Sequence, residues 1–169
     1  MIGKNSSYIN HYHSSLGSIT LASDGEALTG LWFDEQKHFP HKLISDSIET
    51  ELPIFTQTIK WLDTYFGGEV PDFTLQISLQ TTPFRKAVYE ILLLIPYGKT
   101  MTYGEIANIL AEQKGIERMS AQAVGGAVGH NPISIIIPCH RVVGSDGSLT
   151  GYAGGIDRKI ELLKLEKVL

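Results

Sequence analysis

The sequence predicts an α+β fold: a small N-terminal antiparallel sheet plus a helix, followed by a mostly helical C-terminal domain with a helix-turn-helix. Apolar and polar residues alternate at period two in three short runs before residue 34. Helical spacing and helix-capping residues dominate after residue 80. Residues 1–79 hold four Lys and Arg against ten Asp and Glu, a net charge of −6, whereas residues 80–169 hold ten against eight, a net charge of +2.

Three strands are expected at the start of the chain. The alternating runs are Ser7–Tyr12, Gly17–Ala22 and Leu28–Phe33. Ser23–Glu26 has the composition of a tight turn between the last two runs. Residues 34–53 are polar and mixed, which predicts a loop.

One helix is expected to follow the strands, over Ile54–Phe66. Its apolar face would consist of Phe55, Ile59, Leu62 and Phe66. Gly67, Gly68 and Pro71 are typical of the end of a helix. Residues 73–79 alternate again and predict an extended segment that leads into the second half.

The second half begins with a well-marked helix. Thr82 is an N-cap residue and Pro83 suits the first helical position. The apolar face would consist of Phe84, Val88, Ile91, Leu92 and Ile95. Pro96-Tyr97-Gly98-Lys99 then breaks the helix.

Two short helices with a compact connector come next and predict the helix-turn-helix. A capping box over Thr102–Glu105 opens a helix through Leu110, and Ser120 caps a second one that runs toward Gly129. Beyond them, residues 133–143 are expected to be partly extended and 144–155 to form a glycine-rich stretch. A closing helix is predicted from about Asp157 to Val168.

Length and composition exclude several classes of protein. Of the 169 residues, 43% are hydrophobic and 19% charged, which is enough to bury a core and excludes wholesale disorder. The single cysteine excludes an intramolecular disulfide and a zinc site built from cysteine pairs. No apolar run approaches the ~20 residues of a membrane span, and Met1–Asn5 lack the apolar stretch of a secretion signal. We therefore expect a soluble, cytoplasmic protein without a membrane partner.

Cys139 is the strongest candidate for a catalytic nucleophile because two ionisable residues follow it. His140 could accept the thiol proton, and Arg141 could raise the local positive potential that favours a thiolate. Adjacent side chains on a regular strand point to opposite faces, so contact between Cys139 and His140 requires a bend at Pro138 or a bridging water. A lone cysteine after three isoleucines is also typical of a buried apolar residue.

Three glycines in the expected helix at Ala121–Gly129 are a second feature that needs an explanation. Each of Gly125, Gly126 and Gly129 costs roughly 1 kcal/mol relative to alanine in a helix interior. They permit either tight helix packing or the close approach of a phosphate backbone. Cationic or donor groups near this helix would be Lys114, Arg118 and His130.

The run Pro138-Cys139-His140-Arg141-Val142, with Asn131-Pro132 before it and Gly151-Tyr152-Ala153-Gly154-Gly155 after it, resembles the O6-alkylguanine-DNA alkyltransferases. These are also called methylated-DNA–protein-cysteine methyltransferases. The resemblance covers residues 80–169 continuously. It implies a DNA-binding and alkyl-acceptor domain over 80–169, and an N-terminal α/β domain of ribonuclease H-like type over 1–79.

The resemblance implies DNA repair by direct reversal. The alkyl group of O6-alkylguanine, and less readily of O4-alkylthymine, would pass irreversibly to Cys139 in a single turnover without a cofactor. The partner would be double-stranded DNA, bound through the minor groove, with the damaged base flipped out of the stack. We expect a monomer in solution; whether several molecules assemble cooperatively on DNA is left open, as are the preferred alkyl group and the efficiency on O4-alkylthymine.

The same resemblance assigns roles to individual residues. His140 would act on Cys139 through a water, Glu166 would orient its imidazole, Tyr103 would donate a hydrogen bond to the guanine ring, and Asn131 would brace the turn beneath the pocket. Without the resemblance, Tyr103 is typical of a helix-start aromatic and Glu166 of a solvated charge. The residues expected to bind DNA or the flipped base are Arg118, Ala121, Gln122, Ala123, Gly125, Gly126, Arg141, Val142, Tyr152, Ala153 and Gly154.

Two departures from the family pattern concern DNA binding and metal. Many relatives have an arginine where this chain has Gln122; glutamine lacks its charge and its stacking plane. Some relatives carry a structural zinc, but a thiolate site is excluded here because Cys139 is the only cysteine. Four histidines in the N-terminal half could in principle bind a metal, but we expect no metal there: His11, His13, His38 and His41.

Two other classes of function remain as alternatives. A lesion-binding module would recognise alkylated bases without repairing them, but Cys139 and His140 argue against it. A Cys–His hydrolase would need an oxyanion hole and a third orienting residue. Methyl transfer to the protein separates the repair protein from both alternatives.

Overall fold

The computed structural model describes residues 7–149 and 151–169 of the chain. The chain divides after Gln80 into an N-terminal unit and a C-terminal unit. The stretch Met1–Asn5 and Thr150 of the glycine-rich stretch lie outside the described residues. Within the described part of the chain, no helix is long and apolar enough to cross a membrane.

The N-terminal unit is built on a sheet whose first three strands confirm the prediction. They are β1 (Tyr8–Ser14), β2 (Gly17–Ser23) and β3 (Leu28–Phe33), paired antiparallel. The sheet order is β3-β2-β1-β4. The strands form because their alternating residues bury one face completely, as for Ile19, Leu21 and Leu31.

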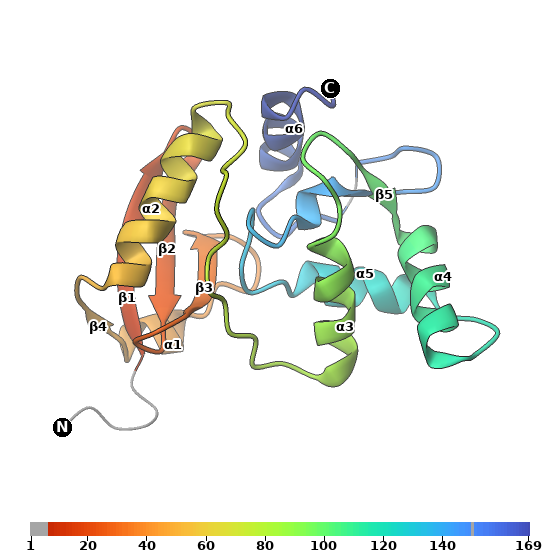
Figure 1. Cartoon of the computed structure of the whole chain (residues 1–169), viewed down its shortest axis with the longest axis horizontal. Helices are drawn as coiled ribbons and strands as arrows, with labels where there is room; N and C mark the ends of the chain where they lie inside the picture. Colours follow the sequence, from red (N-terminus) through yellow and green to blue (C-terminus); the bar gives the residue numbers. More distant parts are fainter. Residues whose placement is uncertain (1–6, 150) are drawn as a thin grey trace. The chain divides into compact units, whose positions relative to one another are not determined.

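Helix α2 (Pro53–Phe66) confirms the expected helix and contacts β1 and β2 (Figure 1). Its buried side chains are Ile54, Phe55, Thr58, Leu62 and Tyr65. The expected face is therefore partly wrong, because Ile59 and Phe66 are only half-buried. Tyr65 takes the buried position instead of Phe66, and the ring of Phe66 stacks on Tyr12 of β1.

The loop predicted over residues 34–53 contains two short elements. A single helical turn, α1 (His41–Ser45), has no side-chain cap and no buried residue. Strand β4 (Ile48–Glu49) pairs parallel with β1 through Tyr8 and Ile9, so the sheet is not purely antiparallel. Elements this short carry no periodicity, and their pairing depends on where the rest of the sheet lies.

The extended segment predicted over residues 73–79 makes one bridge to the sheet. Ile77 pairs with Leu28, and the flanking backbone bonds are Leu28 N–H to Gln76 O and Ser78 N–H to Leu28 O, both 2.9 Å. In the sequence, residues 76–78 come shortly before the division after Gln80.

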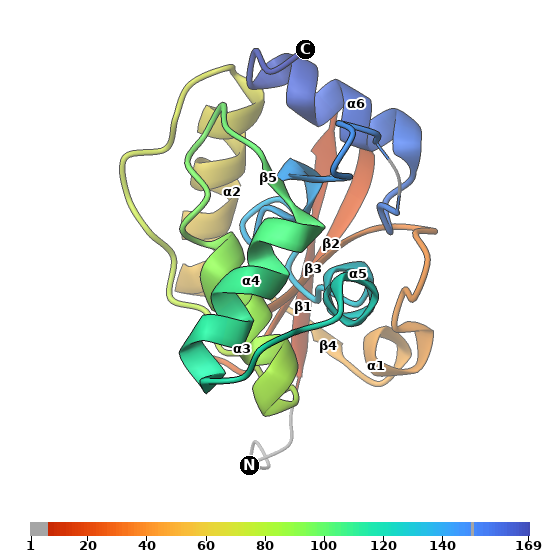
Figure 2. The same ribbon diagram turned by 90° about the vertical axis from the view of Figure 1, so that its right-hand side faces the viewer.

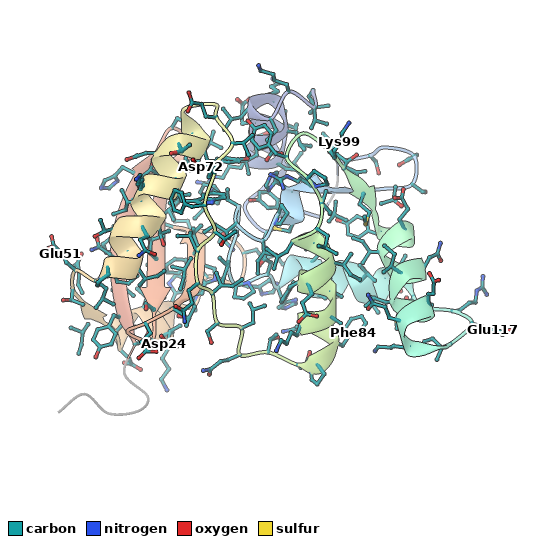
Figure 3. All side chains as sticks on the ribbon, in the orientation of Figure 1. Asp24, Glu51, Asp72, Phe84, Lys99 and Glu117 are labelled. Carbon is teal, nitrogen blue, oxygen red and sulfur yellow. The ribbon has the colours of Figure 1, made fainter. Side chains whose placement is uncertain are left out.

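The C-terminal unit begins with α3 (Pro83–Leu92). The Thr82 hydroxyl accepts a bond of 3.2 Å from the Arg85 N–H, as an N-cap does. Val88, Ile91 and Leu92 are buried, and the chain turns at 93–95 before Pro96. Phe84 lies in the first turn of α3 (Figure 3). The ammonium of Lys114 lies 5.1 Å from the centroid of its ring.

Helices α4 (Tyr103–Lys114) and α5 (Ala121–Gly129) occupy the predicted positions of the helix-turn-helix. They pack on each other and on α3 (Figure 2). Hydroxyls of Thr102 and Ser120 cap their N-termini. Helix α4 extends one turn beyond the predicted Leu110, because the chain can first leave the helix at Gly115, which adopts the left-handed conformation.

The last part of the chain differs most from the prediction. Cys139–Arg141 form a 3₁₀ turn, η1, instead of an extended segment. Strand β6 (Val142–Val143) follows and pairs parallel with β5 (Met101–Thr102). The closing helix, α6 (Ile156–Leu165), ends earlier than predicted, and Glu166 is its C-cap residue.

Candidate active site

Cys139 lies at the start of the turn η1, buried within the C-terminal unit and 2% exposed. Pro138 precedes it with φ −82° and ψ 64°, and the Pro138 carbonyl accepts a bond of 2.9 Å from the Arg141 N–H. The chain therefore bends at Pro138. Because Cys139 and His140 lie in a turn and not on a strand, their side chains need not point to opposite faces.

The surroundings of Cys139 favour the neutral thiol at rest. Burial raises the pKa of the thiol from its usual 9.0 to about 11, despite a hydrogen bond from Asn131, the positive charge of Lys159 and nearby backbone N–H groups. The thiolate is the nucleophilic form of cysteine. A reaction at neutral pH must therefore remove the thiol proton as it proceeds.

His140 and Glu166 form a buried pair next to Cys139 in the turn η1 and at the end of α6. His140 Nε2 lies 2.5 Å from Glu166 Oε2, and both side chains are fully buried. Burial lowers the pKa of the imidazole, although the Glu166 carboxylate opposes that effect. His140 is therefore neutral at pH 7 and able to accept a proton.

Arg141 takes part in this buried cluster. Its Nε donates to Glu166 Oε1 at 2.8 Å, its Nη2 to Oε2 at 3.2 Å, and its Nη1 to the Ile95 carbonyl at 2.8 Å. Arg141 was expected to contact DNA. Its guanidinium is instead directed into the protein, and its side chain is 11% exposed. The charge of Arg141 is used to hold a carboxylate.

Lys159 of α6 is a site residue that the sequence interpretation missed. It is fully buried, and its Nζ donates to the Val142 carbonyl at 2.6 Å. Burial lowers its pKa to about 8, while the Cys139 sulfur acts to raise it. In sequence it is one of several charged residues of an amphipathic helix, and no local pattern marks it as buried.

Asn131 holds the turn that leads to Cys139. Its Nδ2 donates to the Ile137 carbonyl at 2.8 Å, and its Oδ1 accepts from the Ile133 N–H at 3.0 Å. Within this turn Ile135 has φ 70°, a left-handed conformation that β-branched residues rarely adopt. The two bonds from Asn131 help to keep the strained backbone in place.

Tyr103 brings the start of α4 to the same region. Its ring lies beside Gly125 of α5, and its hydroxyl lies close to Gly151 of the glycine-rich stretch. Burial, and then the charge that Cys139 can carry, raise the pKa of Tyr103. The hydroxyl therefore stays protonated and can donate a hydrogen bond. Tyr152 is also buried near Cys139, with Gly154 buried and Ala153 half-buried beside it.

The expected DNA-binding residues before and within α5 are mostly exposed. Arg118 is in the connector before α5, and the first turn of α5 exposes Ala121, Gln122 and Ala123. A Cβ at Gly126 would meet nothing within 4 Å, and one at Gly125 only the Tyr103 ring at 3.9 Å. Close helix packing therefore does not explain these glycines.

The described histidines of the N-terminal unit do not form a cluster that could bind a metal ion. His11 Nε2 lies 3.3 Å from Glu49 Oε1, and His13 Nδ1 lies 3.1 Å from the Ser18 hydroxyl. Among residues 7–149 and 151–169, no three His, Cys, Asp or Glu side chains are close enough to hold a metal ion.

Comparison with known proteins matches both units. Residues 7–79 match the sequence model of the 6-O-methylguanine DNA methyltransferase ribonuclease-like domain, and residues 83–168 match that of the DNA-binding domain of the same proteins. A methylated-DNA–protein-cysteine methyltransferase of Mycobacterium bovis is 45% identical over 161 residues, 93% of this chain and 92% of the relative. One from Haemophilus influenzae is 40% identical over 95% of this chain and 87% of the relative. The crystal structure of Mycobacterium tuberculosis OGT in complex with DNA is 44% identical, with a TM-score of 0.81, and the match covers 95% of this chain and 92% of that one.

Proposed function

Because this chain belongs to the 6-O-methylguanine DNA methyltransferase family, we propose that Cys139 accepts the alkyl group from damaged DNA. The activity of the chain is direct-reversal repair, in which an alkyl group passes from DNA to a protein cysteine. Its sequence contains one cysteine. That observation carries the assignment, because no other residue can serve as the acceptor.

The proposed step is a displacement at the alkyl carbon. His140, acting through a water, takes the thiol proton, and Glu166 stabilises the imidazolium that forms. The sulfur forms a bond to the alkyl carbon as the bond from that carbon to O6 of guanine breaks, and guanine keeps the electron pair. The Tyr103 hydroxyl donates a hydrogen bond to the guanine ring and stabilises this charge. The product thioether is not hydrolysed, so each molecule acts once and needs no cofactor.

DNA is the partner, and we assign its binding to residues 80–169, through a helix-turn-helix made by α4 and α5. The exposed first turn of α5 would enter the minor groove, with the damaged base flipped toward Cys139. Ala153 N–H would lie near the alkylated oxygen, and the Val142 carbonyl would accept from the exocyclic amine. A surplus of two positive charges over this domain is small, so backbone donors must add to phosphate attraction.

We further propose that the protein is a monomer in the cytoplasm. A reducing compartment keeps the single acceptor thiol from oxidation. O4-alkylthymine would be accepted less readily than O6-alkylguanine.

Mass spectrometry tests the assignment directly. The protein is mixed with duplex DNA that contains O6-methylguanine, and a methyl-sized mass increase is expected on the peptide that carries Cys139. The matched controls are Cys139→Ser and an unmodified duplex, both expected to give no increase. Tight binding of the lesion without a mass increase would instead indicate a lesion-binding module, and methyl transfer to Cys139→Ser would overturn the proposal.

A further inference from the structure

We propose that Arg141 is a positioning residue that neutralises Glu166 and thereby keeps His140 uncharged until it accepts the proton of Cys139. This inference rests on the proposed function of Cys139 and deepens it. It assigns to Arg141 a role inside the protein, in place of the contact with DNA expected from its position in the motif.

The geometry shows four hydrogen bonds that converge on one buried carboxylate. Glu166 Oε1 accepts from Arg141 Nε at 2.8 Å and from the Gly98 N–H at 3.1 Å. Glu166 Oε2 accepts from Arg141 Nη2 at 3.2 Å and faces His140 Nε2 at 2.5 Å. Arg141 supplies two of these bonds together with the positive charge. These donors stabilise the ionised form of the buried Glu166 carboxylate.

Arg141 is itself held rigidly. Its remaining nitrogen, Nη1, donates to the Ile95 carbonyl at 2.8 Å, and its guanidinium carbon lies 5.8 Å from the centroid of the Tyr97 ring. The Tyr97 hydroxyl donates in turn to the Leu165 carbonyl at 3.3 Å, one residue before Glu166. A lysine could supply the charge but not this fork of bonds.

The consequence for His140 follows from charge balance. An ionised Glu166 can only accept, so it selects the neutral imidazole with its proton on Nε2 and places the lone pair on Nδ1. With Arg141 present, the Glu166–Arg141 pair has no net charge. Without Arg141, the negative charge of Glu166 would act undiminished on the ring and draw a proton onto it before the reaction. An imidazolium cannot accept the thiol proton.

Other charged groups near His140 act in known directions. Burial lowers its pKa, Glu166 acts to raise it, and Arg141 and Lys159 act to lower it. Tyr97, whose pKa burial and the Glu166 charge raise, stays neutral. Arg141 is the group among these that directly contacts the carboxylate bonded to the ring.

The test is the pH dependence of single-turnover methyl transfer, measured with O6-methylguanine duplex DNA. In Arg141→Met, the acidic limb of the profile is expected to shift to a pH about one unit higher. At a given pH on that limb, transfer is then about tenfold slower than in the original protein. Arg141→Lys keeps the charge and is expected to keep the limb close to that of the original protein. The matched control is Lys164→Met, which removes an exposed cation of α6 that pairs with Glu161 at 3.6 Å; its profile is expected to be unchanged.

Two further measurements keep the inference open to refutation if Arg141→Met does not fold. Nitrogen NMR of the original protein at pH 7 is expected to show a neutral His140 ring; an imidazolium there would overturn the inference. The double variant Arg141→Met with Glu166→Gln removes both charges and is expected to bring the acidic limb back down. A folded Arg141→Met protein with an unshifted profile, or Arg141→Lys shifted as far as Arg141→Met, would also overturn it. Absence of transfer in the original protein would instead refute the proposed function.

Discussion

His140 and Glu166 lie 26 residues apart in sequence, yet their side chains are joined by a hydrogen bond of 2.5 Å at a site with no solvent exposure. The turn η1 supplies the imidazole, and the C-cap of α6 supplies the carboxylate. His140 directly follows the predicted acceptor, Cys139, in the sequence.

Replacing Tyr103 by phenylalanine should slow methyl transfer without unfolding the protein. The ring beside Gly125 is retained, but the hydroxyl that would bond to the leaving guanine is lost. We expect transfer to be about 10- to 100-fold slower, the effect of one lost donor in a desolvated site. Single-turnover kinetics measure it, together with DNA affinity, which should change little. An unaltered rate would show that Tyr103 has only a structural role.

Replacing Gln122 by arginine should tighten DNA binding and make it more sensitive to salt. Gln122 lies in the exposed first turn of α5, where an added guanidinium can reach a phosphate or stack in the vacated base position. One extra phosphate contact steepens the slope of log affinity against log salt by about 1. A salt titration of binding measures this slope. Gln57→Arg adds the same charge on exposed α2 and should have a smaller effect; equal effects would contradict a specific role for position 122.

Replacing Gly126 by alanine should stabilise the protein and weaken its binding to DNA. A Cβ there meets no atom within 4 Å, so the variant gains helix propensity of about 0.5–1 kcal/mol without a clash. The same methyl group would obstruct a DNA backbone that approaches the helix. Thermal unfolding and binding assays measure the two effects. Gly129→Ala, at the end of the same helix, is the comparison, and undiminished affinity in Gly126→Ala would remove the DNA-approach explanation.

The stability of the protein should fall at alkaline pH because of Cys139. The folded thiol has a pKa of about 11 against 9.0 in the unfolded chain, so between these values the folded state binds more protons and stability decreases as pH rises. The expected loss of unfolding free energy is about 2–3 kcal/mol. Lys159, with its pKa lowered to about 8, acts in the opposite direction, and most of this contribution is retained in Cys139→Ser because burial is the largest cause of the shift.

Urea unfolding at several pH values from 8 to 11 is the measurement for this last prediction. The difference in stability between the original protein and Cys139→Ser isolates the thiol. It should shrink with rising pH by the amount given above. A difference that stays constant across this range would mean that the folded thiol titrates normally.

Much of the fold could be predicted because its signals are local. Period-two alternation identified β1, β2 and β3, and the capping residues Thr82, Thr102 and Ser120 located the starts of three helices. A cap contacts the backbone only three residues away, so its sequence pattern is sufficient. Strand β4 escaped prediction because two residues carry no period and pair with β1 across a long separation in sequence.

The candidate site was only partly predictable because only some of its contacts are local in sequence. The residues around Cys139 form a continuous motif, and the family follows from it. The partners of those residues come from elsewhere in the chain: Ile95 and Gly98 before β5, and Lys159 in α6. A buried lysine and an exposed one are identical in a sequence, and burial is decided by which face of α6 packs against η1.

The sequence by itself therefore determined the family, the strands and helices with local signals, and the single cysteine that can accept an alkyl group. Only the tertiary structure decided the charge state of the site. The neutral thiol of Cys139, the neutral ring of His140 and the inward position of Arg141 all depend on burial and on hydrogen bonds between distant residues. Desolvation and Coulomb interactions act through space and not along the chain, which is why folding is required to set them.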